Sequence, residues 1–178
     1  MLYTRKGDNG TSGLFGTKER LPKNSLIYDA LGSLDELNSL LGFCRAQESV
    51  KKGAELDIAS EILKVQQCLF VIQAEIAGSQ KILSQADVGD LEESIDKIEA
   101  LIENPHAFVI PGATVLSGLF DFARAVSRRT ERAVISIASD HTLSAYTTAY
   151  LNRLSSFLYV LARHMATLEG AKELSPHY

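Results

Sequence analysis

The stretch LSAYTTAYLNRLSSFLYVLARHMATLE at residues 143–169 repeats apolar side chains at three- and four-residue intervals. The repeat consists of Tyr150, Leu151, Leu154, Leu158, Leu161 and Met165. Such spacing puts the apolar side chains on one side of an α-helix. Similar repeats precede it at about 26–47, 54–79, 86–103 and 114–138. The sequence therefore predicts an all-α fold in which five amphipathic helices form an antiparallel bundle.

The length of 178 residues suits a single domain with a sizeable core. We expect an N-terminal loop at 1–25 that belongs to this domain, the bundle at 26–170, and a C-terminal tail at 171–178. Residues 1–25 have no apolar periodicity and are rich in Gly, Thr, Ser, Lys and Arg. That composition predicts a loop that is ordered by itself or by a ligand.

Composition and charge exclude several classes of protein. A formal net charge of −4 argues against a broadly basic nucleic-acid surface. No apolar run approaches the roughly 18 residues that cross a bilayer, and the first residues lack the apolar core of a signal peptide. We therefore expect a cytoplasmic protein with reduced, buried thiols at Cys44 and Cys68. The four histidines have no metal-ligand spacing, so we expect no metal site made by protein side chains.

The N-terminal loop carries glycines at 7, 10, 13 and 16, with hydroxyl and basic side chains between and after them. Glycines let neighbouring backbone N–H groups converge on an anion, and Arg5, Lys6 and Lys23 add positive charge. This combination favours a polyphosphate ligand. No Gly-Lys-Ser or Gly-Lys-Thr follows the glycines, so the loop is not a Walker A motif. The alternative, a flexible glycine-rich tail, stays open on the loop alone.

Four arginines lie within nine residues of the fourth predicted helix: Arg124, Arg128, Arg129 and Arg132. Arg124, Arg128 and Glu131 share one face, opposite the apolar stripe. Like charges four residues apart repel, so the cluster requires an anion or carboxylates as partners. The guanidinium group binds phosphate oxygens in pairs. The alternative is a surface strip that pairs with acids of a neighbouring helix.

Other polar residues allow two interpretations each. Asn152 shares a helix face with Ser156, Tyr159 and Arg163, and this polar stripe either lines a pocket or faces solvent. Asp35 is either an exposed acid or the partner of an arginine. Taken by itself, Phe108, which lies in the break before the fourth predicted helix, favours a loop anchor over a functional ring.

Five segments occur together in an order and spacing that resemble a known family. They are Thr4–Gly13, Gly32–Ser39, Phe108–Gly112, Ala123–Arg132 and Leu151–Ser155. The chain resembles the PduO-type ATP:cob(I)alamin adenosyltransferases from about residue 3 to residue 166. The resemblance implies a five-helix bundle of the ferritin-like cobalamin adenosyltransferase type. It also implies a homotrimer with active sites between subunits.

The implied reaction transfers the 5′-deoxyadenosyl group of ATP to the cobalt of cob(I)alamin, which gives adenosylcobalamin and triphosphate, with Mg²⁺ accompanying ATP. A cob(II)alamin reductase and an adenosylcobalamin-dependent enzyme are the partners to expect. The loop residues that the family pattern assigns to ATP are Thr4, Arg5, Lys6, Gly7, Asp8, Gly10, Thr11, Ser12 and Gly13. Further ATP contacts are implied for Lys23, Arg128, Glu131 and Asn152, with Arg129 and Arg132 close by.

The family pattern also assigns residues to the corrin side of the site. Arg124 and Asp35 match a salt bridge across the subunit interface, so the resemblance favours Asp35 as an arginine partner. Phe108 matches a ring that displaces the lower axial ligand of cobalamin, and this reverses the loop-anchor interpretation. Together with Arg128, these residues make the implied catalytic set.

The sequence departs from the family pattern at three positions. Asp121 replaces a common histidine, Ser156 a frequent aspartate, and Ala113 a second glycine. Asp121 adds a negative charge near the arginine cluster, where it could pair with one of the arginines. Two other functions stay open: an ATP-dependent phosphotransferase, and a non-catalytic bundle that binds ATP or adenosylcobalamin and hands the latter to a partner.

Overall fold

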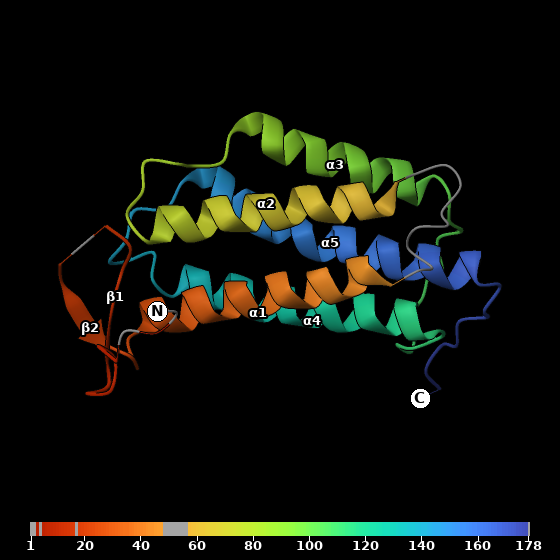
Figure 1. Cartoon of the computed structure of the whole chain (residues 1–178). Coiled ribbons are helices and arrows are strands. Elements are labelled where there is room, and N and C mark those ends of the chain that lie inside the picture. The colour runs from red at the N-terminus through yellow and green to blue at the C-terminus, as the bar shows by residue number, and fades with distance from the viewer. Residues whose placement is uncertain (1–2, 4, 17, 48–56, 178) are drawn as a thin grey trace.

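Five long helices alternate in direction along one axis of the molecule (Figure 1). They are α1 (Leu26–Ala46), α2 (Ile58–Ile76), α3 (Gln85–Glu99), α4 (Val115–Ile135) and α5 (Ala145–Leu168). This computed structural model describes residues 3, 5–16, 18–47 and 57–177. The predicted all-α class and five-helix bundle are confirmed. No helix within the described residues is long and apolar enough to cross a membrane.

The helix ends follow local capping chemistry. Ser84 and Asp87 form a reciprocal capping box at the start of α3, and Thr114 and Ser117 form another at the start of α4. The α3 helix ends at Glu99, before the predicted 103, because residues 100–102 continue as separate turns ahead of Pro105. The other bounds agree with the predicted ones to within a few residues, and the predicted start of α2 at 54 lies outside the described residues.

Helix α5 lies at the centre of the bundle. It packs against α3 and α4, whereas α1 packs against α2 and α4. All six apolar residues of the repeat predicted for this helix are buried. On α4, Ala123 and Val126 are buried as expected, and Leu119 and Ala133 are half-buried. The 3.6-residue periodicity therefore identified the inward faces correctly.

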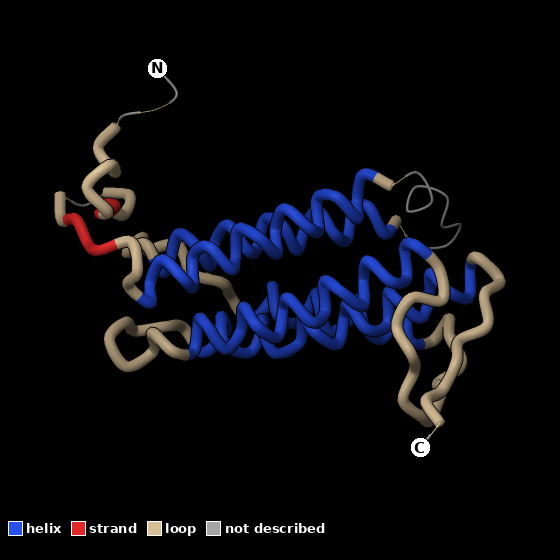
Figure 2. Tube along the Cα trace, turned by 90° about the horizontal axis from the view of Figure 1, so that it is seen from below, coloured by secondary structure: helices blue, strands red, loops and turns tan. Residues whose placement is uncertain are grey.

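The N-terminal segment differs from the predicted irregular loop. Strands β1 (Thr11–Gly13) and β2 (Arg20–Pro22) pair antiparallel, with Ser12 opposite Leu21. Three-residue strands are too short to show a readable alternation, so the sequence pattern missed them. This hairpin lies at the end of the bundle where α1 begins, and the loop before α4 and the C-terminal tail lie at the other end (Figures 1 and 2).

Both cysteines are free thiols, and only Cys44 is fully buried. Burial raises the pKa of the Cys44 thiol to about 11. At pH 8 this thiol is almost entirely protonated, and the thiolate is the reactive form. In a Cys68→Ser variant, we expect iodoacetamide to modify Cys44 at least about a hundredfold more slowly in the folded than in the urea-unfolded protein. Equal rates, measured by intact mass, would contradict the buried position.

Candidate active site

The N-terminal hairpin is held together by Arg20. Its guanidinium Nη2 donates to the backbone carbonyls of Lys6 at 2.6 Å and Thr11 at 2.8 Å, and its Nε donates to Thr11 Oγ1 at 2.9 Å. Thr11 Oγ1 in turn donates to Asn9 Oδ1 at 2.7 Å. One side chain of β2 therefore fixes the glycine-rich segment in a defined shape.

The same hairpin places a second cation, the Lys23 ammonium group, next to the glycines. A Cβ atom at Gly7 would lie only 3.1 Å from Lys23 Nζ, so the absence of a side chain lets this ammonium approach the backbone. The Lys23 N–H donates to the Gly10 carbonyl at 2.9 Å, and Gly10 has the positive φ of 76° that a glycine adopts without strain. Arg5 stacks on the ring of Tyr3, 5.3 Å from its centroid. The geometry suits a phosphate group at the glycines.

A large cleft opens between α3, α4, α5 and the loop that precedes α4, and it extends from that loop to Arg128 and Arg153 in the middle of the bundle. Its volume is about 1160 Å³. That exceeds the size of an ordinary small-molecule pocket. The ring of Phe108 lines the cleft and is 78% exposed, so it does not anchor the loop in the core. The structure thus presents Phe108 to a ligand rather than to the protein interior.

Helix α4 gives the cleft a cationic wall. Arg124 and Arg128 both line it, and neither forms an ion pair with any residue that the structure describes. The Arg124 guanidinium lies over the Tyr159 ring, 5.7 Å from its centroid. Opposite, α3 contributes Asp96 and Glu99 to the lining. The cleft therefore has one basic and one acidic side.

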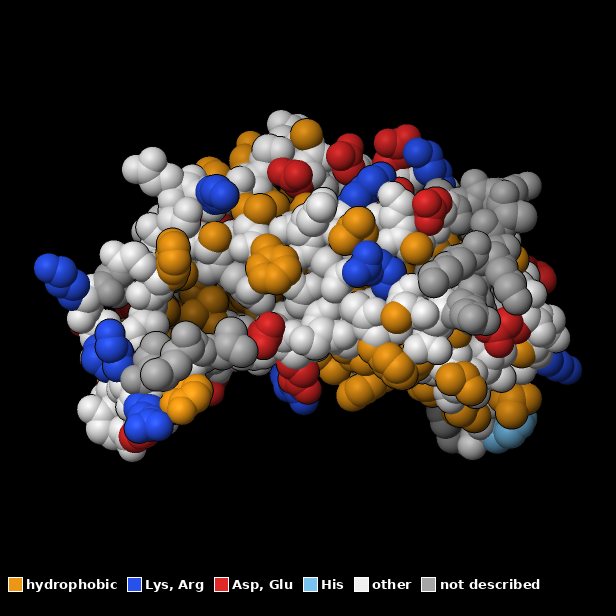
Figure 3. Space-filling model, in the orientation of Figure 1, with side chains coloured by type: hydrophobic (Ala, Val, Ile, Leu, Met, Phe, Trp, Pro, Cys, Tyr) orange, Lys and Arg blue, Asp and Glu red, His pale blue; other side chains and the backbone are white. Residues whose placement is uncertain are grey.

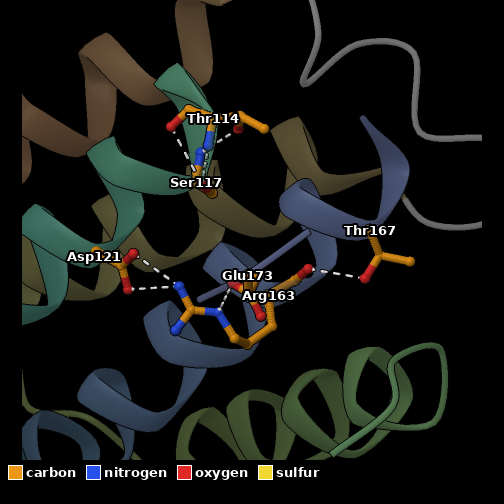
Figure 4. Close-up of polar contacts among 6 residues, drawn as sticks. All are labelled: Thr114, Ser117, Asp121, Arg163, Thr167 and Glu173. Carbon is orange, nitrogen blue, oxygen red and sulfur yellow. Dashed lines mark hydrogen bonds and ion pairs between the residues drawn. The ribbon is translucent and has the colours of Figure 1, made fainter. Parts of the chain in front are cut away.

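A buried ion pair closes the floor of this cleft. Arg163 is 3% exposed and Asp121 is 8% exposed, and Nη2 of the arginine bonds both carboxylate oxygens at 2.9 and 2.8 Å (Figure 4). The Arg163 guanidinium also lies 4.9 Å from the centroid of Tyr159. Asp121 therefore pairs with an arginine of α5 and not with one of the α4 cluster. Asp121 lies on the side of α4 that faces α5, whereas Arg128, Arg129 and Arg132 are exposed.

Other members of the predicted set find partners on adjacent helices. Asn152 Nδ2 donates to Glu131 Oε1 at 3.2 Å, which joins two of the predicted ATP contacts across α4 and α5. Arg129 forms an ion pair with Glu36 of α1, and this matches the sequence alternative of a strip paired with neighbouring acids for that one arginine. Arg132 is exposed near the end of α4.

The predicted residues fall into two groups within one chain. Arg5, Lys6, Gly7, Asp8, Gly10, Thr11, Ser12, Gly13 and Lys23 come together in the hairpin region, whereas Phe108, Arg124 and Arg128 meet in the cleft. None of the described hairpin residues belongs to the lining of the cleft. Asp35 is exposed on α1 and forms no ion pair with another described residue. Thr4 lies outside the described residues.

Sequence reasoning missed two residues that shape these regions. No sequence pattern singled out Arg20, yet its side chain organises the hairpin. Arg163 was recognised as part of a polar stripe but not as the partner of Asp121. Of the stripe, Ser156, Tyr159 and Arg163 line the cleft, whereas Asn152 is exposed and lies outside the lining.

The comparisons with known proteins all indicate the same family. A family model described as cobalamin adenosyltransferase matches residues 2–165. A corrinoid adenosyltransferase of Citrobacter freundii is 38% identical over 91% of this chain and 93% of the relative, and one of Bacillus subtilis is 34% identical over 95% and 88%. A variant PduO-type ATP:corrinoid adenosyltransferase from Lactobacillus reuteri, complexed with cobalamin and ATP, superposes with a TM-score of 0.90 at 26% identity, covering 100% of both chains.

The role of Arg20 in holding the hairpin can be tested by hydrogen exchange. We expect Arg20→Ala to accelerate hydrogen exchange of the backbone amides at residues 7–13 by roughly tenfold or more, because three charge-assisted hydrogen bonds are lost. The helices should keep their protection. Lys18→Ala, which removes an exposed charge from the same segment, is the matched control. Unchanged exchange in the Arg20 variant would show that the hairpin is held by other contacts.

Proposed function

Because the chain belongs to the cobalamin adenosyltransferase family, we propose that it transfers the 5′-deoxyadenosyl group of ATP to the cobalt of cob(I)alamin. The observation that carries this proposal is the cleft, whose lining combines an exposed Phe108 with Arg124 and Arg128, neither of which forms an ion pair with a described residue. A flat, amide-bearing macrocycle such as a corrin needs a wide cleft with polar walls and an apolar ring. The products are adenosylcobalamin and triphosphate.

The chemistry requires orientation and charge rather than a general base. The Co(I) centre supplies the electron pair that forms the bond to C5′, and the C5′–O bond breaks with its electrons on the departing triphosphate. Cobalt is thereby oxidised to Co(III). Negative charge collects on the leaving group, and preorganised cations stabilise it. Arg128, Lys23 and the backbone of the hairpin are the groups we assign to this task.

The same assignment predicts that each active site joins two subunits. Within one chain the hairpin lies at one end of the bundle (Figure 2), and none of its described residues lines the cleft. ATP bound by both must therefore bridge neighbouring copies, with Asn152 and Glu131 of one subunit facing the hairpin of the next. Asp35 and Arg124, both unpaired within the described chain, are suited to an ion pair across that interface.

Exposed apolar side chains support an interface on the α1–α4 side of the bundle. Phe43 of α1 and Phe122 of α4 are each 55% exposed, and Val115 is 81% exposed. Apolar surface of this kind gathers along the lower edge of the molecule in Figure 3. Contiguous exposed apolar patches mark contact surfaces in soluble proteins. We propose that the chain assembles through this side as a homotrimer.

We propose that Mg²⁺ binds together with ATP. Among the described residues no group of three or more histidine, cysteine, aspartate or glutamate side chains could hold a metal ion. Mg²⁺ binds phosphate oxygens and keeps several waters. We therefore assign its ligands to the triphosphate and water, while the protein holds the complex through Lys23 and the hairpin. The reductase, the adenosylcobalamin-dependent partner enzyme and the cytoplasmic location stay predictions.

The proposal is tested by mixing the protein anaerobically with ATP, Mg²⁺ and chemically reduced cob(I)alamin. We expect the visible spectrum to change to that of adenosylcobalamin, with triphosphate in equal amount, because the whole adenosyl group moves. ADP as product would favour a phosphotransferase. ATP binding without turnover would favour the non-catalytic bundle, and either result would overturn the proposal.

A matched pair of variants places the reaction in the cleft. Arg128→Ala should lower kcat/KM by about a hundredfold or more, because a cation opposite the leaving triphosphate is removed. Lys97→Ala removes one positive charge from α3, outside the cleft lining, and should leave the rate within about twofold. Equal rates for the two variants would remove Arg128 from the site.

Phe108 is expected to act before adenosyl transfer. A ring that displaces the lower ligand makes cob(II)alamin easier to reduce, so Phe108→Ala should slow the route that starts from cob(II)alamin by about tenfold or more. The route that starts from cob(I)alamin should change much less. Phe70→Ala, at another exposed aromatic position on α2, serves as the control. Equal slowing of both routes would contradict the displacement role.

A further inference from the structure

The C-terminal tail after α5 folds back against Arg163 of the cleft floor and against the loop before α4. The Glu173 carboxylate lies 2.5 Å from Nε of Arg163, on the side of the guanidinium that Asp121 does not occupy (Figure 4). The Glu173 side chain is 20% exposed, although it belongs to a tail with no regular secondary structure. Burial raises the pKa of its carboxyl; Arg163 lowers that pKa and Asp121 raises it. Glu173 thus extends the buried pair of the cleft floor into a three-residue cluster.

The next residue of the tail contacts the loop that carries Phe108. The Ile110 N–H donates to the Leu174 carbonyl at 2.7 Å, a short and favourable backbone hydrogen bond. Ile110 is two residues from Phe108. No other backbone hydrogen bond in the described chain ties residues 107–111 to another element. The position of the exposed ring is therefore set from one side by the tail.

The loop itself needs such support. His106 has a φ of 49°, in the left-handed region, which non-glycine residues seldom adopt. Its N–H is held by Asn104 Oδ1 at 3.0 Å on the near side, and Gly112 with φ of 97° redirects the chain on the far side. Between these two fixed points Phe108 has no core contact that would fix its ring, because 78% of the residue is exposed.

We propose that Glu173 is a positioning residue for the adenosyltransferase reaction: by binding Arg163 it holds the tail at 171–177 in place, and the Leu174 carbonyl then fixes the loop that presents Phe108. The inference rests on the proposed function, because it assigns Glu173 a role that acts through Phe108. Through this role the buried ion pair of the cleft floor is connected, by way of the tail, to the ring of Phe108. Asp121 takes part indirectly, since it orients the guanidinium that Glu173 binds.

The link can be measured first without any ligand. In Glu173→Ala, hydrogen exchange at the Ile110 amide should rise by about tenfold or more, because its acceptor is no longer held against the loop. Glu173→Gln keeps the size of the side chain and tests the charge alone, with a smaller rise. Glu169→Ala, an exposed acid just beyond the end of α5, is the matched control and should leave Ile110 unchanged. An unchanged Ile110 amide in Glu173→Ala would overturn the proposal.

The functional measurement follows Phe108. With cob(II)alamin and ATP bound, we expect Glu173→Ala to reduce the fraction of four-coordinate cob(II)alamin, seen by electron paramagnetic resonance, by about half or more. Adenosylation from pre-reduced cob(I)alamin should stay within about twofold of the parent protein. A loss confined to the cob(I)alamin route, or a four-coordinate fraction equal to that of the parent, would contradict the positioning role.

A double variant separates this role from a general loss of stability. If Glu173 acts through Phe108, adding Glu173→Ala to Phe108→Ala should slow the cob(II)alamin route no further, because the ring it positions is already gone. Additive slowing would overturn the proposal. An inactive parent protein would instead defeat the proposed function, and the exchange measurement at Ile110 would still decide whether the tail holds the loop.

Discussion

The buried pair of Arg163 and Asp121 is the interaction on which the cleft depends. An arginine that is 3% exposed costs much free energy unless its charge is matched, and the two carboxylate oxygens of Asp121 provide the match by both accepting from Nη2. The pair joins α4 to α5 where these helices form the cleft floor. Because two hydrogen bonds tolerate little sliding, it also fixes the relative position of the helices that carry Arg124 and Tyr159.

A second constraint comes from the position of the hairpin. The hairpin lies at one end of the bundle and contributes no described residue to the cleft, so a single chain has two separate half-sites. A ligand that needs both the glycines near Lys23 and the arginines of α4 has to lie between copies. Assembly would bury the apolar side chains of α1 and α4, which accounts for their exposure in a single chain. The position of the hairpin, the exposed apolar side chains and the proposed chemistry thus all favour an active site between subunits.

The helices were predictable from the sequence, because the repeated apolar spacing in each segment specifies its inward face. The hairpin was not, because β1 and β2 are held by Arg20 rather than by alternating side chains. The arginine cluster was visible as a charge pattern, but the pattern could not show that Arg129 has a partner on α1 whereas Arg128 has none among the described residues. Partners that lie far apart in sequence depend on packing, and periodicity carries no information about packing between elements.

The departures from the family pattern bear on the choice between an enzyme and a non-catalytic bundle. An aspartate at 121 would weaken the enzyme interpretation if it neutralised Arg124 or Arg128, since the leaving triphosphate needs an unpaired cation. Its carboxylate is instead bound by Arg163, an arginine of this chain's own α5, and both cleft arginines keep their charge unmatched within the described chain. Ser156 lines the cleft without adding charge. The carboxylate at 121 is thus paired with an arginine outside the α4 cluster, which leaves the cationic wall intact and favours the catalytic interpretation.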